Sequence, residues 1–402
     1  MSWPHVIPYA NPIYFLWLAV ALLPMIFMLL IKGKRWGWYQ SLITLIFLYI
    51  SFGGKYWQQG LALIGYVIFQ TLLVWCYHHY RQQKNASGIF YLAVALAILP
   101  LTLVKVIPFV DGGAAAIFGF LGISYLTFKS VQMIMEMRDG TIKEYHPLRY
   151  IQFLLFFPTI SSGPIDRYRR FEKDLLEPPT REVYAGLLNR GIWSIFLGFF
   201  YKFILGYYFG QVWLPLLNKS LMHQGFFSWS LILYMYCYSM YLFFDFAGYS
   251  LFAVGVSNLM GYDTPKNFNK PFISDNIKEF WNRWHMTLSF WFRDFIYMRL
   301  MFTLIKKKVF KSRIVASNVG YFALFMIMGV WHGLTWYYLL YGFYHASLIC
   351  LTDAWLRFKK KHKKQLPSNK FTKALAIFLT FQAVCFSFLI FSGVLDQLFF
   401  HH

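Results

Sequence analysis

The sequence predicts an all-α polytopic membrane protein of about ten or eleven transmembrane helices, with further re-entrant or interfacial helices. Hydrophobic residues make up 58% of the 402 residues, and charged residues make up only 13%, about half the share of a soluble domain. Apolar runs of about 20 residues, enough for a helix to cross the hydrocarbon core, recur from end to end. This composition excludes a secreted disulfide scaffold, a disordered regulator and a cytosolic enzyme.

Apolar runs define the predicted elements in chain order. The clearest spans are 12–31, 60–77, 88–108, 187–205, 226–246, 318–335, 336–356 and 374–395, and shorter runs at 38–53 and 113–128 could also cross. Three apolar stretches carry Pro, Gly, Arg or Asp, namely 148–163, 247–262 and 280–300. Irregular backbone survives at membrane depth only where protein or a water-filled cavity surrounds it. We therefore expect these three stretches to be re-entrant or interfacial, within one pocketed domain over 1–402.

Basic residues predict how the chain is oriented. The net charge is +22, which in a soluble chain would suggest nucleic acid, but here orientation bias and anionic headgroups explain it. Lys and Arg cluster at 32–35, 81–84, 167–173, 306–313 and 357–373. Placing all five groups on the inner side of a cell membrane requires an inward crossing at 113–128 and puts both termini outside. The four cysteines lie in or beside apolar runs without metal-ligand spacing, so we expect no metal site.

Polar chemistry is densest in 263–300. If 277–295 is one helix, Glu279 and Arg283 form an i, i+4 pair, and His285 lies among aromatic residues on a face shared with Trp281. One interpretation is an interfacial helix anchored by Trp and Arg, with a structural His285. The other is a cavity-facing site. Asn269, Trp281 and Arg283 are candidates to line a substrate path.

A second histidine interrupts the apolar stretch around 329–336. His332 is costly if it faces lipid, so it should face a cavity or a partner, and flanking glycines such as Gly333 allow another group to come close. A neutral imidazole, with an ordinary pKa of about 6.5, can accept a proton. Trp331 and Gly333 are candidates for the path beside it. The alternative is a hydrogen-bonded core histidine, the role we expect for His345.

Two further observations limit the chemistry. Asp245 lies at the end of an aromatic span and could cap a helix or orient a histidine. The sequence contains no Walker loop, dinucleotide glycine fingerprint, HExxH motif or GxSxG elbow. The remaining candidate groups are histidines, which suit proton abstraction from an alcohol or assistance to acyl transfer.

Together these motifs resemble the membrane-bound O-acyltransferase superfamily, and within it the D-alanyl transfer members of Gram-positive bacteria. The resemblance covers about residues 119–346. It implies a ring of helices around a central funnel and acyl transfer from a thioester to a hydroxyl. It also implies that His332 is catalytic and that His285 is the second characteristic polar residue. The stretches that carry it are GISYLTFKS, FFPTISSGPIDRYRRF, FDFAGYSLFAVG, NFNKPFISDNIKEFWNRWHMTLSFWFRDFIY and GVWHGLTWYYLLYGFYHA.

The resemblance also implies the substrates and partners. The donor would be D-alanine on the 4'-phosphopantetheine of a small acidic carrier protein in the cytosol, with no cofactor bound to the membrane protein itself. The product would be esterified teichoic acid in the cell wall, with an extracytoplasmic partner completing the transfer. An acidic carrier would be attracted to a basic, partly apolar segment, although positive-inside topology explains the same charges. The docking candidates are Met301, Phe302, Ile305, Lys306, Lys307, Lys311 and Arg313.

Two rival functions remain. A polysaccharide O-acetyltransferase of the same superfamily would use the same histidines, but such relatives usually show Pro-Leu-Gly-Gly where this chain has Met298-Arg299-Leu300 after Tyr297. A transporter or flippase could use the two histidines as a proton relay, because interrupted helices suit transporters as well. Labelled D-alanyl carrier and acetyl-CoA, offered in turn as donors, would separate these functions.

Overall fold

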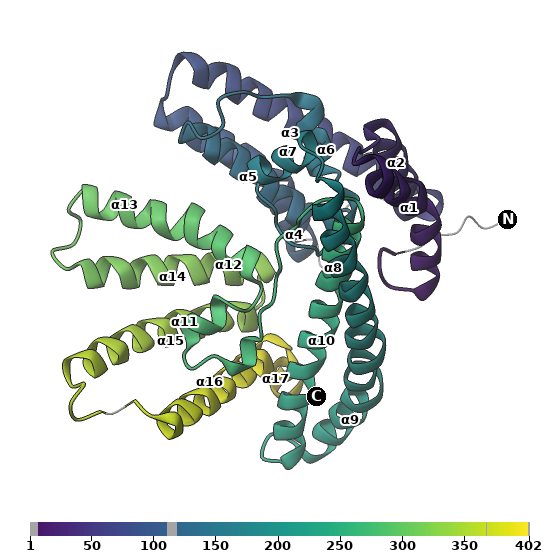
Figure 1. The fold of residues 1–402 in the computed structure, drawn as a ribbon. Helices are drawn as coiled ribbons and strands as arrows, with labels where there is room; N and C mark the ends of the chain where they lie inside the picture. The colour runs from purple at the N-terminus through teal and green to yellow at the C-terminus, as the bar shows by residue number, and fades with distance from the viewer. Residues whose placement is uncertain (1–6, 111–118, 367, 401–402) are drawn as a thin grey trace. The chain divides into compact units, whose positions relative to one another are not determined.

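The computed structural model describes residues 7–110, 119–366 and 368–400, and this part of the chain contains helices and no strands (Figure 1). Seven of the described helical segments are long and apolar enough to cross a membrane, which confirms an all-α polytopic membrane protein. The chain divides into two compact units, one of residues 1–198 and 249–265 and the other of residues 199–248 and 266–402.

The first unit begins with helices that match the predicted spans. Pro12 occupies the first turn of α1 and Asn11 caps it by accepting a hydrogen bond from the Ile13 N–H, while Gly33 ends it with a φ of +58°, the left-handed geometry that glycine permits. The helices of this unit are α1 (Pro12–Lys32), α2 (Gly37–Phe52), α3 (Trp57–Gln83), α4 (Ser87–Val110), α5 (Ile123–Arg138), α6 (Pro147–Leu154), α7 (Tyr168–Leu176) and α8 (Arg181–Phe199).

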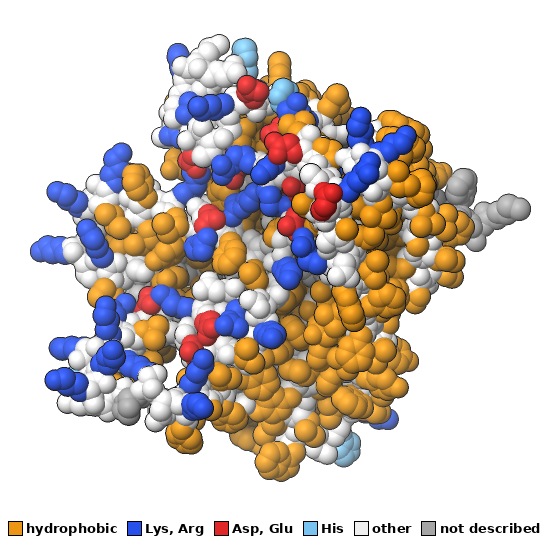
Figure 2. Space-filling view, in the orientation of Figure 1, with side chains coloured by type: hydrophobic (Ala, Val, Ile, Leu, Met, Phe, Trp, Pro, Cys, Tyr) orange, Lys and Arg blue, Asp and Glu red, His pale blue; other side chains and the backbone are white. Residues whose placement is uncertain are grey.

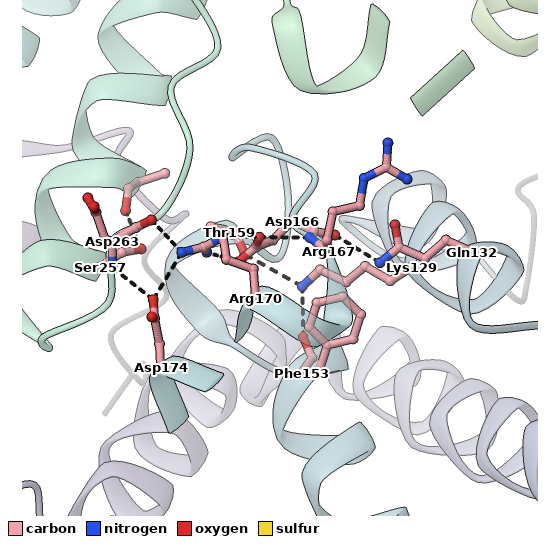
Figure 3. Close-up of polar contacts among 11 residues, drawn as sticks. Lys129, Gln132, Phe153, Thr159, Asp166, Arg167, Arg170, Asp174, Ser257 and Asp263 are labelled. Atoms are coloured by element: carbon pink, nitrogen blue, oxygen red, sulfur yellow. Dashed lines mark hydrogen bonds and ion pairs between the residues drawn. The ribbon is translucent and has the colours of Figure 1, made fainter. Parts of the chain in front are cut away.

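Helix α5 is the buried centre of the first unit. The predicted crossing at 113–128 lies partly outside the described residues, and its described helix begins at Ile123 and is buried along most of its length. On α5, the Lys129 ammonium donates to the Phe153 carbonyl at 2.8 Å (Figure 3). It also donates to the Leu154 carbonyl at 3.4 Å. These are the last carbonyls of α6, which the helix itself cannot satisfy. The predicted break within 148–163 is confirmed, because a 3₁₀ turn follows at Phe157–Thr159.

Basic loops of the first unit meet one another. Arg170 on α7 pairs with Asp166 and with Asp174, the latter at 2.9 Å (Figure 3). Arg35, which follows α1, donates to the carbonyls of Asp174 at 2.6 Å and Gly261 at 2.7 Å. The basic groups after α1 and before α7 therefore lie on one side of this unit, as the positive-inside pattern predicts.

The predicted interruption at 247–262 is wrong. Helix α10 (Trp229–Leu259) runs through it without a break. Gly255 is in the helix because the chain packs closely there: a Cβ at this position would lie 2.7 Å from the Ile195 side chain and 2.9 Å from the Gly191 carbonyl. The glycines that suggested a break are thus helix-packing residues.

The second unit contains a series of helical hairpins. The α13–α14 and α15–α16 connections lie on the same side of this unit (Figure 1), and Lys and Arg side chains gather over both (Figure 2). The α14–α15 connection lies at the opposite end. The elements are the π-helical stretches η3 (Phe200–Gly206) and η4 (Tyr208–Trp213), α9 (Leu214–Gln224), α11 (Ile277–Trp281), α12 (Met286–Phe292), the π-helical η6 (Arg293–Tyr297), α13 (Met298–Lys306), α14 (Arg313–His332), α15 (Trp336–Lys361), α16 (Lys370–Phe391) and α17 (Val394–Phe400).

The number of spans stays a prediction. Among the described residues, α2 is shorter than the seven long apolar segments and α15 is not one of them. The run at 113–128, which the predicted count includes, lies partly outside the described residues. The ring around a central funnel also stays a prediction.

Candidate active site

A close helix crossing positions His332. Helix α14 ends at His332 and α15 begins four residues later. A Cβ on Gly329 would lie 2.6 Å from the Tyr338 carbonyl oxygen, and a Cβ on Gly342 would lie 2.5 Å from the Phe325 carbonyl oxygen. Because neither position has a side chain, the two backbones touch. The expectation that glycines beside His332 allow a close approach is confirmed.

Aromatic rings surround His332 without sealing it. The ring of Trp331 lies 4.6 Å from the imidazole, that of Phe391 4.9 Å away, and those of Tyr338 and Tyr341 each 6.0 Å away. Gly333 permits this packing, since a Cβ there would lie 2.5 Å from the Tyr338 ring. His332 itself stays partly exposed, so these rings do not enclose it completely.

His285 occupies a break between two helices. The single helix expected over 277–295 is wrong, because α11 ends at Trp281 and α12 begins after His285, whose φ is +41°. Such a left-handed conformation costs a non-glycine residue about 1–3 kcal/mol and persists where the surroundings impose it. The Met286 N–H donates to the Asn267 carbonyl at 2.8 Å, and the Asn269 N–H donates to the Arg283 carbonyl at 2.9 Å. These two backbone hydrogen bonds fix the non-helical conformation of the chain between α11 and α12.

His285 has buried, aromatic surroundings. The Phe246 ring lies 4.7 Å from the imidazole ring. The predicted Glu279–Arg283 pair is present at 2.5 Å. Arg283 and Asn269 therefore support the loop that carries His285, Arg283 through its carbonyl and its ion pair.

A cavity of about 310 Å³ opens beside this site in the second unit. Lys278 and Arg293 line it together with the apolar side chains of Phe325 and Met328, and Trp281 forms part of its wall. Met328 lies one helical turn before His332 on α14, about 6 Å along the helix axis. The cavity therefore comes within one helical turn of His332, which is not itself among the lining residues.

The predicted capping role of Asp245 is wrong, because it lies in the middle of α10. Its carboxylate pairs with the Lys202 ammonium from η3, and its place among the candidates for the substrate path stays a prediction. Sequence reasoning missed Lys202, although a lysine inside an apolar span is itself a signal that a partner is needed. It also missed the hydrogen-bond partner of His345, the indole of Trp281.

The docking candidates form an exposed segment. On α13, Phe302 is 68% exposed and Ile305 is 44% exposed, with Met301 partly buried beside them. The basic candidates continue from the end of α13 into the turn before α14 and are all exposed: Lys306, Lys307, Lys311 and Arg313. An apolar stripe bordered by cations therefore exists where the sequence predicts it.

Comparison with known proteins identifies similar sequences along nearly the whole chain. Residues 36–391 match the model of the membrane-bound O-acyltransferase family. A teichoic acid D-alanyltransferase of Lacticaseibacillus rhamnosus is 55% identical over 98% of this chain and 99% of that protein. Its counterpart in Bacillus subtilis is 51% identical over 98% and 99%. A probable alginate O-acetylase of Pseudomonas aeruginosa is 30% identical, over only 58% of this chain and 42% of that protein.

Proposed function

Because the chain belongs to the membrane-bound O-acyltransferase family and is an acyltransferase, we propose that it transfers D-alanine from a thioester donor to a hydroxyl of teichoic acid. The observation that carries this proposal is the partly exposed His332 in its aromatic surroundings, one helical turn from a cavity. The D-alanyltransferase relatives support the choice of acyl group, since they match end to end, whereas the alginate O-acetylase covers 58% of the chain.

His332 acts as general base in the proposed reaction. One of its imidazole nitrogens takes the proton of the acceptor hydroxyl, whose oxygen attacks the thioester carbonyl. The carbon–sulfur bond breaks, the thiolate leaves, and the proton passes from His332 to that sulfur. Base assistance of this kind contributes about 10²–10⁴-fold in rate. His285, held at the helix break nearby, helps to shape the site.

The donor enters from the side of the basic hairpin loops, which positive-inside topology makes cytosolic. An acidic carrier protein docks on the α13 stripe, with the cations around it attracting the carrier. Its phosphopantetheine thioester fits the cavity because Arg293 is half-exposed at 52% and pairs with the Asp294 carboxylate through Nε at 2.9 Å. The terminal guanidinium nitrogens remain as donors for a phosphate. Beyond Arg293 the cavity is lined by Phe325 and Met328, which suit the apolar part of the arm. The esterification of teichoic acid is completed outside the membrane, where an extracytoplasmic partner takes part.

The base is tested by replacing it. His332→Ala should lower the rate of labelled D-alanine transfer to purified teichoic acid by about 10²-fold or more, while the purified protein keeps its thermal unfolding midpoint. The control is His362→Ala, which removes a partly exposed histidine from the turn after α15. A wild-type rate in the His332 variant would exclude it as the base. Transfer from acetyl-CoA but not from a D-alanyl donor would replace this function with O-acetylation.

Carrier docking is tested separately. Phe302→Asp should raise the KM for D-alanyl carrier and leave the KM for the small thioester D-alanyl-pantetheine unchanged, because only the carrier reaches the exposed stripe around Phe302 and Phe302 does not line the cavity. Phe227→Asp is the control, since Phe227 is 98% exposed in the turn before α10. Equal KM values for the carrier in all three proteins would place docking elsewhere.

A further inference from the structure

His345 is a fully buried histidine with a defined tautomer. It is 0% exposed on α15, and the Trp281 indole N–H donates to its Nδ1 at 3.2 Å. Since an indole nitrogen can only donate, Nδ1 must carry the lone pair, and the hydrogen of the neutral imidazole is on Nε2. Among the described residues Nε2 has no hydrogen-bond partner, whereas most buried polar atoms have one. The one hydrogen bond that the His345 imidazole makes among the described residues is therefore the one to Trp281.

His345 lies between the cavity and the base. Tyr341 and Ile349 flank it on α15, one helical turn to each side. The Tyr341 ring is 4.6 Å from that of His345 and 6.0 Å from that of His332. Ile349, at the other end, lines the cavity. Residues four apart share one helix face, so α15 presents a continuous row from the cavity to His332.

Trp281 joins this row to the cavity. Its indole forms part of the cavity wall and packs on Phe325, with ring centres 5.2 Å apart, while its N–H is held by His345. The imidazole ring centre is 4.9 Å from that of the indole. Rotation of this large side chain would change the inner end of the cavity, where a thioester has to pass to reach His332.

We propose that His345 is a positioning residue for acyl transfer: by accepting the Trp281 N–H it fixes the indole that shapes the way from the cavity to His332. This inference rests on the proposed function, because it assumes that a thioester enters the cavity. His345 does not touch the reacting atoms; it acts through Trp281.

The test uses the full-length protein in lipid vesicles with D-alanyl-pantetheine as donor. His345→Phe keeps a ring but no acceptor, and kcat/KM should fall about tenfold, as expected when a buried donor loses its partner. His345→Asn should restore most of the rate, because its carbonyl oxygen can replace Nδ1. Trp281→Phe should show a similar loss. The double variant Trp281→Phe with His345→Phe should fall no further than the lower single variant, since both remove one hydrogen bond.

A spectroscopic signal measures the hydrogen bond independently of activity. The Trp281 indole N–H resonance in ¹⁵N-labelled protein, assigned by its loss in Trp281→Phe, should shift in His345→Phe and return in His345→Asn. The control is Tyr344→Phe on α15, the helix that carries His345: this variant keeps its ring but loses a hydroxyl hydrogen bond to the Ala383 carbonyl on α16. Its rate should match that of the wild type.

Several outcomes would overturn the inference. These are an unchanged indole resonance in His345→Phe, multiplicative losses in the double variant, or an equal loss in Tyr344→Phe. If the wild type transfers no D-alanine, the proposed function fails instead. If the wild type transfers D-alanine and His345→Phe does so equally well, only the role of His345 fails. Should His345→Phe not fold, Trp281→Phe and His345→Asn provide the same comparison.

Discussion

Replacing Gly342 by alanine tests whether the close crossing of α14 and α15 sets the position of His332. A Cβ at this position would lie 2.5 Å from the Phe325 carbonyl oxygen and 3.5 Å from the Gly329 Cα. The first distance is about 1 Å shorter than ordinary van der Waals contact. Both close atoms belong to backbone, so no side chain can rotate away, and the two helices have to separate.

The separation has two measurable effects. Overpacking of this kind costs about 1–3 kcal/mol of stability. Tyr341 is the neighbour of Gly342 on α15 and its ring faces His332, so a movement of about 1 Å changes the surroundings of the base directly. A misplacement of that size can lower a rate by about 10²-fold. Activity should therefore fall further than the loss of stability explains.

The assay compares D-alanine transfer and thermal unfolding of the purified wild type, Gly342→Ala and Gly186→Ala. Gly186 is a matched control because it lies within α8 and an added Cβ meets nothing within 4 Å. Alanine there should leave the rate unchanged and stabilise the helix slightly, by up to about 1 kcal/mol. If Gly342→Ala keeps the wild-type rate and unfolding midpoint, the crossing does not position the base.

Two further predictions concern the loop that supports His285 and the buried lysine. Burial raises the pKa of Glu279, but hydrogen bonds from the Asp275 N–H and from Arg283 outweigh it and lower the pKa. The stability from this carboxylate is therefore present above the ordinary glutamate pKa of about 4.3 and is lost as the pH falls through the lowered value. The unfolding midpoint of the wild type should drop more between pH 5 and pH 3 than that of Glu279→Gln, and parallel curves would contradict this. Lys129→Met leaves two buried α6 carbonyls without their donor and should destabilise the protein by about 1–3 kcal/mol. An unchanged thermal unfolding midpoint would show that another group satisfies these carbonyls.

The sequence predicts the features that depend on local pattern. Long apolar runs correspond to helices such as α1 and α16 because hydrocarbon demands both length and internal hydrogen bonding. The Glu279–Arg283 pair follows from helical spacing, and its i, i+4 geometry survives although the helix ends in between. The closeness of His332 to the start of α15 follows from the glycines that flank it.

Features that depend on contacts between segments far apart in the chain could not be predicted from the sequence pattern. The glycines around 248–255 suggest a break when considered alone, but the partner of Gly255 is Gly191, about sixty residues away in the chain. The left-handed backbone of His285 depends on bonds from 267–269. The partner of Asp245 is Lys202, and no spacing rule connects the two. The only sequence signal is the free-energy cost of a charge in an apolar span, which indicates that Asp245 and Lys202 each need a partner.

The packing of the two π-helical stretches between Phe200 and Trp213 against α10 depends on the number of residues in that segment. Gly206 and Gly210 face α10 there, the first against the Asp245 backbone and the second against the Tyr241 ring. Each residue of an α-helix turns the chain by about 100°. The loss of a single residue would therefore rotate the residues that follow it about the helix axis, and a different face of the helix would lie against α10. Point substitutions leave this phase intact, but insertions and deletions do not, and evolution or engineering can alter this helix in composition far more readily than in length.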